Sequence, residues 1–415
     1  MSNSKITTGE WTGEYNPFTD TEERRVLFAA LDSFKIYRKT AHRNVTHRRR
    51  QNLYALPTSQ WQILAEPPFS LLENLSNVDD AIDLNADIAD AILEWGLQTF
   101  GLPQEPGSDH AQKWLGCAQA VDVDKAHSTI RQFYRDWSAE SARERKPCHD
   151  FVLEQLEVFF QNRAALCNEA SRPKILVPGA GLGRLVYEIC RAGYDVEGNE
   201  ISYHQLLASN WILNHVGSTQ YALYPFATQF TNLLSRKQQL RKVMIPDVQP
   251  AEGMKHVLAN GKSTGEMNMT AGDFIVLYSG SEYSAVFDAV ATMFFIDTAP
   301  NLIRYIDTVK NCLKADGRWI NIGPLLWHSD IAYEAPTDER HDHKTRVGEA
   351  DRDAGIGEPG SFELTEEEVI WLLEKQGFRI EHRSAFSDGV GYIQDPDSMF
   401  QNMYRVSCWV ARKGD

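Results

Sequence analysis

Three glycines and one glutamate are the residues of this chain whose types and spacing point most directly to chemistry. Gly179, Gly181 and Gly183 alternate directly after Lys174–Val177, a run with strand character, and a helical pattern follows. Glycine is needed where a turn requires positive φ or where a ligand lies against bare backbone. Glu200 follows where a second strand should end, and an acid there can accept hydrogen bonds from ribose hydroxyls. This layout predicts a site for a nucleotide-like cofactor.

The position of the third glycine distinguishes two classes of cofactor. A dinucleotide fingerprint, G-x-G-x-x-G, requires a small residue at position 184, whereas this chain has Arg184 there and Gly183 one position earlier. The G-x-G-x-G form resembles the first motif of class I S-adenosylmethionine-dependent methyltransferases. The same pattern also fits a tight strand-to-helix turn that binds no ligand, so the other motifs have to decide.

Length, composition and charge limit the class of protein. The 415 residues suggest two domains, and a hydrophobic content of 42% is enough to build real cores. The net charge of -15 argues against an extended nucleic-acid surface, because phosphate binding needs a basic face. No apolar run approaches the ~18 residues of a membrane span, and the first residues lack the apolar core of a secretory signal.

The cysteines and a pair of histidines were the candidates for metal or redox chemistry. The six cysteines are scattered without a C-x-x-C pair, which fits reduced thiols in a cytosolic or nuclear protein rather than disulfides or zinc ligands. His341 and His343 lie in a polar stretch with no further ligands at fixed spacing. We therefore expect no metal site.

The periodicity predicts a helical region followed by an α/β region. We expect a flexible segment over 1–20, a helical domain over 21–170 and alternating strands and helices over 171–415. The alternation implies a parallel sheet with right-handed crossovers. Insertions are expected near 215–270, which should hold a short strand, and near 330–360, which reads as a charged, glycine-rich loop or lid.

A basic segment follows the first predicted helix. Arg38–Arg50 holds five arginines, one lysine and two histidines. Such a segment is typical of a solvated helix face. The alternative is contact with an acidic partner or with the chain's own acidic surface.

Four further residues have types and positions suited to a transfer reaction. Asp273 can accept from an adenine amino group and Phe274 can stack on the ring, although an ordinary turn aspartate beside a core phenylalanine gives the same pattern. Asp297 and His328 follow two predicted strands, at the sheet edge where ligands collect. Asp297 could instead cap the next helix, and His328 could be structural.

Four motifs in order give these residues a family context: Val177–Leu185, Gly198–Ser202, Phe294–Ala299 and Trp319–His328. Together they resemble the carnosine N-methyltransferase family, the N2227-like S-adenosylmethionine-dependent enzymes. The stretch Thr129–Trp137 is also similar to the family, and the similarity extends from the first predicted helix to the C-terminus. It implies an α/β fold, a Rossmann-like seven-stranded class I methyltransferase sheet with an N-terminal helical domain that contributes to the cofactor site.

The resemblance also implies roles for individual residues. Residues that would hold S-adenosylmethionine are Gln132, Arg135, Gly179, Gly181, Gly183, Glu200, Asp273, Phe274 and Met293. Residues that would surround the substrate imidazole are Asp297, His328, Tyr392 and Tyr404, with Asp297 and His328 as the catalytic pair. Arg135 would pair with the cofactor carboxylate and Glu200 with its ribose. Family members carry a run of tyrosines before the last strand, and Asn402 replaces one that would face the substrate.

The implied activity is methyl transfer from S-adenosylmethionine to the imidazole ring of carnosine, giving anserine, or of a related histidine-containing di- or tripeptide. A protein-histidine methyltransferase and a cofactor-binding regulatory protein without turnover are the alternatives. The resemblance also suggests a homodimer formed by the helical N-terminal region. We expect a cytoplasmic protein, with a nuclear fraction, and neither nucleic acid nor membrane as a partner.

Overall fold

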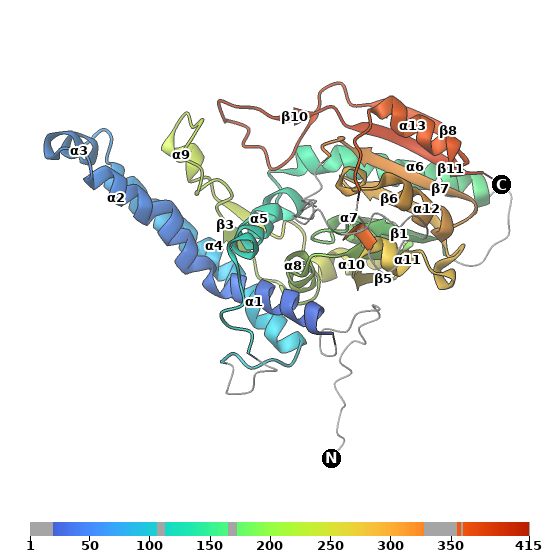
Figure 1. Cartoon of the computed structure of the whole chain (residues 1–415), viewed down its shortest axis with the longest axis horizontal. Helices are drawn as coiled ribbons and strands as arrows, with labels where there is room; N and C mark the ends of the chain where they lie inside the picture. Colours follow the sequence, from blue (N-terminus) through green and yellow to red (C-terminus); the bar gives the residue numbers. More distant parts are fainter. Residues whose placement is uncertain (1–19, 106–112, 165–171, 328–354, 358–359, 415) are drawn as a thin grey trace, which may run out of the picture.

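A seven-stranded sheet beside a layer of N-terminal helices makes up the fold (Figure 1). The computed structural model describes residues 20–105, 113–164, 172–327, 355–357 and 360–414. In sheet order the strands are β5 (Met267–Ala271), β2 (Asp195–Glu200), β1 (Lys174–Pro178), β6 (Phe287–Met293), β7 (Leu313–Gly323), β11 (Ser407–Lys413) and β8 (Phe378–Ala385). The first five run parallel, and β11 pairs antiparallel with both β7 and β8. This order confirms the predicted Rossmann-like sheet with an antiparallel final pair.

Helices cover both faces of the sheet because its strands are apolar on both sides. Along β1, Leu176 packs on one face, whereas Ile175 and Val177 pack on the other, as the two-residue period of a strand requires. The Leu176 face is covered by α11 (Phe274–Tyr278), α12 (Leu302–Cys312) and α13 (Glu366–Lys375). The opposite face is covered by α6 (Ala142–Ala164) and α7 (Arg184–Arg191).

The N-terminal helices dock on the sheet unit through one apolar core. They are α1 (Thr21–Ala41), the π-helical turn η1 (His42–His47), α2 (Arg48–Tyr54), α3 (Thr58–Ala65), α4 (Leu71–Thr99) and α5 (Ala120–Trp137). On α5, Ile130, Phe133 and Trp137 recur at helical spacing and are at most 1% exposed. The ring of Phe133 meets that of Trp211, on α8 (Tyr203–Asn214), edge to face at 5.6 Å. The core therefore fixes α5 against the sheet unit.

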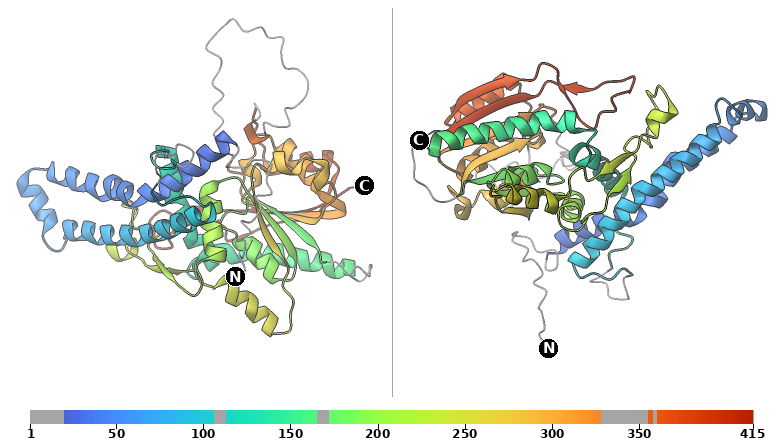
Figure 2. Two further views of the ribbon diagram at one scale, coloured as in Figure 1. Left: turned by 90° about the horizontal axis from the view of Figure 1, so that it is seen from below. Right: turned by 180° about the vertical axis from the view of Figure 1, so that it is seen from behind.

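The basic segment Arg38–Arg50, which begins in the last turn of α1, lies on the acidic side of α4. Arg38 binds three carboxylates of α4 at 2.7–2.9 Å, those of Asp83, Asp87 and Asp90. His42 and Arg50 both contact Asp79. The structure shows two of the interpretations left open by the sequence: these side chains contact the chain's own acidic surface, whereas Lys39, Arg43 and Arg48 are exposed, as on a solvated helix face. Helices α1, α2 and α4 extend well away from the sheet (Figure 2).

In the part of the chain that the structure describes, two small antiparallel pairs lie outside the main sheet. The first joins β3 (Tyr221–Leu223) to β4 (Val243–Ile245), and the second joins β9 (Val390–Gly391) to β10 (Met403–Tyr404). The insertion also carries α9 (Arg236–Gln239) and α10 (Pro250–Ala259), and four short helical turns are η1, η3 (Ser281–Tyr283), η4 (Ile296–Thr298) and η5 (Gly355–Gly357). The insertion is shorter in the structure than the predicted range 215–270, because β5, at the end of that range, pairs with β2 and belongs to the main sheet. The predicted last strand, which began at Tyr404, starts at Ser407 instead.

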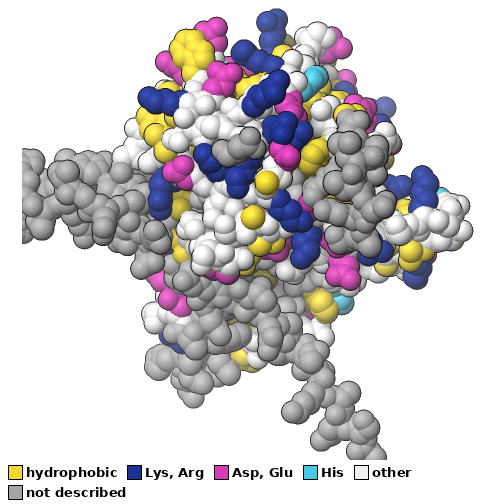
Figure 3. All heavy atoms as spheres, turned by 90° about the vertical axis from the view of Figure 1, so that its right-hand side faces the viewer, with side chains coloured by type: hydrophobic (Ala, Val, Ile, Leu, Met, Phe, Trp, Pro, Cys, Tyr) yellow, Lys and Arg dark blue, Asp and Glu magenta, His cyan; other side chains and the backbone are white. Residues whose placement is uncertain are grey.

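Among the described residues, no helix is long and apolar enough to cross a bilayer. On the face drawn in Figure 3, lysine and arginine side chains are interspersed with acidic ones. The five described cysteines are free thiols, and four of them are buried.

Candidate active site

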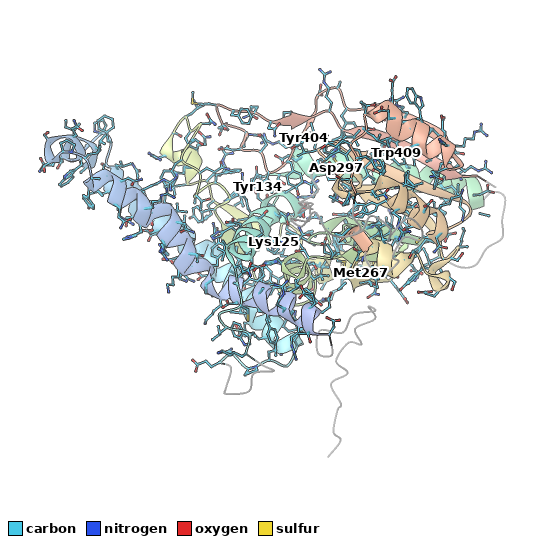
Figure 4. All side chains as sticks on the ribbon, viewed as in Figure 1. Lys125, Tyr134, Met267, Asp297, Tyr404 and Trp409 are labelled. Carbon is cyan, nitrogen blue, oxygen red and sulfur yellow. The ribbon has the colours of Figure 1, made fainter. Side chains whose placement is uncertain are left out.

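A cavity of about 490 Å³ lies at the carboxyl ends of β1, β2 and β6, where α5 meets the sheet. Ten of the predicted site residues line it: Gln132, Arg135, Gly179, Gly181, Glu200, Phe274, Met293, Asp297, Tyr392 and Tyr404. Figure 4 labels two of them, Asp297 and Tyr404, which come from different parts of the sequence and face this one cavity. His328 and the predicted 330–360 loop, apart from η5, lie outside the described residues.

The glycine loop brings bare backbone to the cavity. Gly179 and Gly181 have φ of +66° and +56°, a region that side chains disfavour. A methyl group on Gly179 would overlap the ring of Phe295, whereas one on Gly181 would meet no atom within 4 Å. The open side of Gly181 therefore belongs to the cavity, and a ligand can lie against its backbone.

Gly183 packs against α8 and does not face the cavity, so its predicted contact with the cofactor stays a prediction. It precedes α7 with φ of +74°, and a methyl group on it would come within 2.8 Å of Leu213. Gly183 does not line the cavity. Its small size serves the close packing of α7 against α8, which keeps the loop in position.

Glu200 closes β2 directly beside the loop. Its carboxylate accepts from the backbone N–H of Gly181 at 2.9 Å and from those of Ile201 and Ser202 at 2.9 Å. Burial raises the pKa of Glu200, and the three backbone donors offset part of this effect. The amide of Gln205 lies 2.9 Å from this carboxylate and 3.0 Å from the amide of Gln132. Sequence reasoning did not identify Gln205 as a site residue, because a glutamine five residues after Glu200, on the next helix, belongs to no distinctive motif.

Arg135 offers unpaired hydrogen-bond donors inside the cavity. Its side chain is 7% exposed, and Nε and Nη2 have no partner among the described residues. The guanidinium group lies 4.8 Å from the ring of Phe294 and 4.6 Å from that of Tyr392. Asp136 is its ionic neighbour, at the long distance of 3.4 Å. Two buried, unused donors on a forked cation fit an incoming carboxylate.

Asp273 is placed differently from its neighbour Phe274. The Phe274 ring lines the cavity and meets Phe295 edge to face at 5.6 Å. One oxygen of Asp273 caps α11 through Ile275 and Val276, and the other accepts from the N–H of Ile356 at 2.8 Å. Asp273 does not line the cavity, because helix capping and the η5 turn use both of its oxygens. Its predicted contact with adenine stays a prediction.

Asp297 lies in η4, just beyond the end of β6, and is 4% exposed. Its Oδ2 accepts from the N–H of Leu326 at 2.9 Å. The alternative that Asp297 caps the next helix does not hold, since Asn301 occupies the cap of α12. Asp297 is thus a buried carboxylate facing the cavity from the sheet edge.

Aromatic side chains form the wall next to Asp297. The ring of Phe294 lies 5.4 Å from that of Tyr392 and 6.2 Å, edge to face, from that of Tyr404. Asn402 is exposed and does not line the cavity, so its amide is not a direct contact in this structure. A planar ring bound here would lie among aromatic faces beside one carboxylate.

Arg184, which stands where the dinucleotide motif requires a small residue, has a structural role. Arg184 is buried, donates to Asp247 at 2.6 Å and to the backbone oxygen of Asp136 at 3.0 Å. Its guanidinium also lies over the Trp137 ring at 4.8 Å. Arg184 therefore ties the helix after the glycine loop to the end of α5, where Arg135 and Asp136 reach the cavity. Nothing in the local sequence identifies Asp247 as its partner.

A methyl-donor cofactor fits this cavity. In the part of the chain that the structure describes, no group of three or more His, Cys, Asp or Glu side chains could hold a metal ion. The open backbone at Gly181 lets a ligand approach closely. The acid Glu200, the unpaired nitrogens of Arg135 and the ring of Phe274 suit three parts of S-adenosylmethionine, respectively its ribose hydroxyls, carboxylate and adenine. The histidine pair at 341 and 343 lies outside the described residues.

Comparison with known proteins decides the family. The family model "Carnosine N-methyltransferase" matches residues 112–415, from before α5 to the C-terminus. This chain belongs to the carnosine N-methyltransferase family. Membership of this family, together with the sheet order, makes it an S-adenosylmethionine-dependent methyltransferase with a class I fold.

Curated relatives carry the same family name over most of the chain. The carnosine N-methyltransferase of Schizosaccharomyces pombe is 33% identical over 95% of this chain and 97% of its own length. That of Mus musculus is 34% identical over 94% of this chain and 86% of its own length. The carnosine N-methyltransferase unmet of Drosophila melanogaster is 36% identical over 72% of this chain and 57% of its own length. The family relationship therefore includes the N-terminal helices as well as the sheet.

Proposed function

We propose that this chain transfers a methyl group from S-adenosylmethionine to an imidazole nitrogen of carnosine, giving anserine, or of a related histidine-containing di- or tripeptide. The relatives named carnosine N-methyltransferase support this substrate. The observation that carries the proposal is that Asp297 and an aromatic wall face the same cavity as Glu200 and the glycine loop. One cavity thus provides for both a nucleoside and a flat, polar ring.

The chain's own residues bind and orient the two reactants. Gly181, Glu200, Arg135 and Phe274 would hold S-adenosylmethionine, which supplies an electrophilic methyl group on its sulfonium. Met293 and the Phe294 ring lie in the same lining and would separate the reacting atoms from water. Holding two reactants in line converts an encounter into a unimolecular step, which is a large part of the rate gain.

The nucleophile of this reaction is a neutral imidazole nitrogen. Free imidazole has a pKa of about 6.5, so most of it is unprotonated at neutral pH and no strong base is required. A hydrogen bond accepted by Asp297 from the far N–H of the ring would select one tautomer and aim the other nitrogen's lone pair. As positive charge develops on the ring, the Asp297 carboxylate and the faces of Tyr404 and Phe294 would stabilise it.

His328 keeps its proposed role as a second residue that accepts the far ring proton or positions the ring. It lies one residue beyond Trp327, whose indole N–H donates to the Leu364 carbonyl at 2.8 Å. Leu326 lines the cavity, so the described range that ends at Trp327 stops beside the cavity. The two roles are separable, because loss of a proton acceptor changes the pH profile and loss of a positioning contact changes KM.

Product analysis tests the proposed reaction. Purified protein is incubated with carnosine and S-adenosylmethionine, and mass spectrometry with fragmentation locates the added methyl group on one ring nitrogen. We expect a single singly methylated product. A protein whose product appears only on histidines of polypeptides would be a protein-histidine methyltransferase, and one that binds cofactor without any product would be a regulatory binder.

We also propose a homodimer formed through α2, α3 and the start of α4, the end of the N-terminal helices that lies farthest from the sheet. Three large apolar side chains there, Tyr54, Ile63 and Phe69, are 52–61% exposed. Light scattering should give twice the chain mass, and Ile63→Asp should give monomers. The matched change Leu258→Asp, at an apolar side chain of α10 that is 55% exposed, should leave the dimer intact, and a monomeric wild type would contradict the proposal.

Cytoplasmic and nuclear localisation stays a prediction, which imaging of the tagged chain tests.

A further inference from the structure

A second cavity, of about 350 Å³, lies next to the first and has no role in the reaction described above. Its lining comes from α1, α4, α5, the β3 region and the segment after β9, and includes Tyr37, Asn85, His127, Arg131 and Ile393. Tyr392 lines both cavities. The two spaces are therefore neighbours across one tyrosine.

Helix α5 gives one arginine to each cavity. Arg135 lines the first and Arg131 lines the second. Residues four apart on a helix are neighbours on its surface; the Arg135 guanidinium lies 4.6 Å from the Tyr392 ring, and that of Arg131 lies 5.9 Å from the ring of Phe226. His127 precedes Arg131 by one further turn and stacks on Tyr37 with ring centroids 4.2 Å apart. The second cavity is thus a polar extension of the first along α5.

Arg131 has a buried donor to offer. Its Nη2 donates to the carbonyl of Ile393 at 3.3 Å, whereas Nε is buried and has no partner within the described ranges. The two carboxylates whose charges act on Arg131 are otherwise engaged. Glu144 accepts from the N–H groups of Ile393 and Gln394 at 2.8 and 2.9 Å, and Asp395 accepts from Gln238 at 2.6 Å.

A half-buried arginine whose Nε–H is buried and unused is a poor element of a stable core. Leaving a charged donor unpaired costs on the order of 1–3 kcal/mol or more, and the flat guanidinium fork matches a carboxylate better than any other group. The same reasoning assigned the cofactor carboxylate to Arg135, so a second carboxylate is the ligand chemistry that Arg131 fits.

We infer that Arg131 and the second cavity bind the free carboxylate of the histidine-containing peptide substrate. This inference rests on the proposed function, because the substrate ring has to lie beside Asp297 and Tyr392. Only the α- and β-carbons separate the carboxylate of a histidine from its ring, so the carboxylate reaches the shared wall at Tyr392. The substrate amino group, being cationic, is repelled from Arg131 and points away from it.

This placement gives the site a rule for selecting substrates. A peptide that ends in histidine presents a carboxylate to Arg131, whereas a histidine inside a polypeptide presents a neutral amide. A small peptide with C-terminal histidine is favoured for that reason, and an internal histidine leaves the arginine unpaired. Arg131 is a specificity residue here and takes no part in the transfer itself.

Two substrates and three variants test the inference. Carnosine is compared with β-alanylhistamine, the same molecule without the carboxylate, in wild type and in Arg131→Gln, Arg131→Lys and Lys125→Gln. Lys125 is exposed, lies on the same helix (Figure 4) and lines neither cavity, so its change removes one positive charge from α5 without touching either site. kcat and KM are measured separately for each pair.

Wild type should use carnosine with a kcat/KM roughly 10- to 100-fold above that for β-alanylhistamine, the range expected for a charged hydrogen bond. Arg131→Gln should remove this ratio through KM, with β-alanylhistamine almost unaffected. Arg131→Lys should give an intermediate ratio and Lys125→Gln the wild-type ratio.

A wild-type ratio near one, or equal losses for both substrates in a folded Arg131→Gln protein, would overturn the inference while leaving the proposed reaction in place. If Arg131→Gln does not fold, the wild-type ratio and Arg131→Lys decide. Absence of product from both substrates in wild type would instead overturn the proposed function.

Discussion

The carboxylate of Asp247 lies between two buried arginines, 2.6 Å from Arg184 and 2.8 Å from Arg145. Arg184 begins the helix after the glycine loop, Arg145 belongs to α6, and Asp247 comes from the insertion after β4. The backbone N–H of Asp247 also donates to the carbonyl of Trp137 at the end of α5. One aspartate thus connects three elements of the sheet unit to the helix that carries Arg135.

The first prediction concerns this aspartate. Asp247→Asn should lower the free energy of unfolding by about 3–5 kcal/mol, because it leaves the buried Arg145 without its carboxylate and Arg184 with Glu188 alone. Denaturant titration measures the change. The control Glu22→Gln removes the partner of Arg25 in a pair whose side chains are 70% and 56% exposed, and it should cost less than about 1 kcal/mol. Equal effects of the two changes would contradict the role of Asp247.

The second prediction separates backbone strain from ligand contact at the glycine loop. Gly181→Ala and Gly261→Ala each place alanine at positive φ, +56° and +71°, with no atom within 4 Å. Both should destabilise the fold by about 1 kcal/mol. Only Gly181→Ala should weaken cofactor binding, by roughly tenfold or more, because the methyl group occupies space that the ligand needs. Calorimetric titration with S-adenosylhomocysteine checks this, and unchanged affinity in Gly181→Ala would refute the contact.

The third prediction concerns the unpaired nitrogens of Arg135. Arg135→Gln should weaken S-adenosylhomocysteine binding roughly 10- to 100-fold, because a charged hydrogen bond to its carboxylate is lost. The unliganded protein should not lose stability in proportion, since Nε and Nη2 have no partner among the described residues and the contact with Asp136 is long, at 3.4 Å. Arg135→Lys should restore only part of the affinity, as an ammonium lacks the planar fork. Wild-type affinity in Arg135→Gln would show that the carboxylate binds elsewhere.

The fourth prediction is a loss of stability in mild acid that depends on His204. This side chain is 3% exposed, and burial lowers its pKa from 6.5 to about 4. Between these values the unfolded chain binds a proton that the folded chain does not. The free energy of unfolding should therefore fall by about 3 kcal/mol as the pH drops from 6.5 to 4.

Comparison of variants isolates this histidine from the other acid-sensitive groups. His204→Gln should lose that part of the pH dependence, whereas His256→Gln, at an exposed histidine of α10, should keep it. Denaturant titrations at several pH values measure both. An unchanged slope in His204→Gln would mean that His204 titrates alike in the folded and unfolded states.

The sequence predicted those parts of the site that follow from local pattern. Alternating glycines after a strand predict a turn with positive φ, and Gly179 and Gly181 have it. Gln132 and Arg135 lie three residues apart on α5, and both line the cavity, as the family resemblance implied. These features depend on a few neighbouring residues, which is why pattern was sufficient.

Features that depend on distant partners could not be predicted in this way. Asp247 and Gln205 belong to the site only because the insertion and α8 fold against α5 and β2. Asp273 has the residue type for adenine recognition, but two backbone segments use its oxygens in the structure. The edge strand β5 was hidden in an irregular stretch, since pairing with β2 rather than its own pattern makes it a strand.

The most direct test of the central claim is the variant Asp297→Asn, assayed for both S-adenosylhomocysteine binding and carnosine turnover. Because Asp297 is proposed to orient the substrate ring and not to hold the cofactor, calorimetry should give wild-type affinity for S-adenosylhomocysteine, while kcat should fall by about 100-fold or more, the scale of a lost orienting and charge-stabilising group. Full turnover of carnosine by a variant with intact cofactor binding would contradict the account.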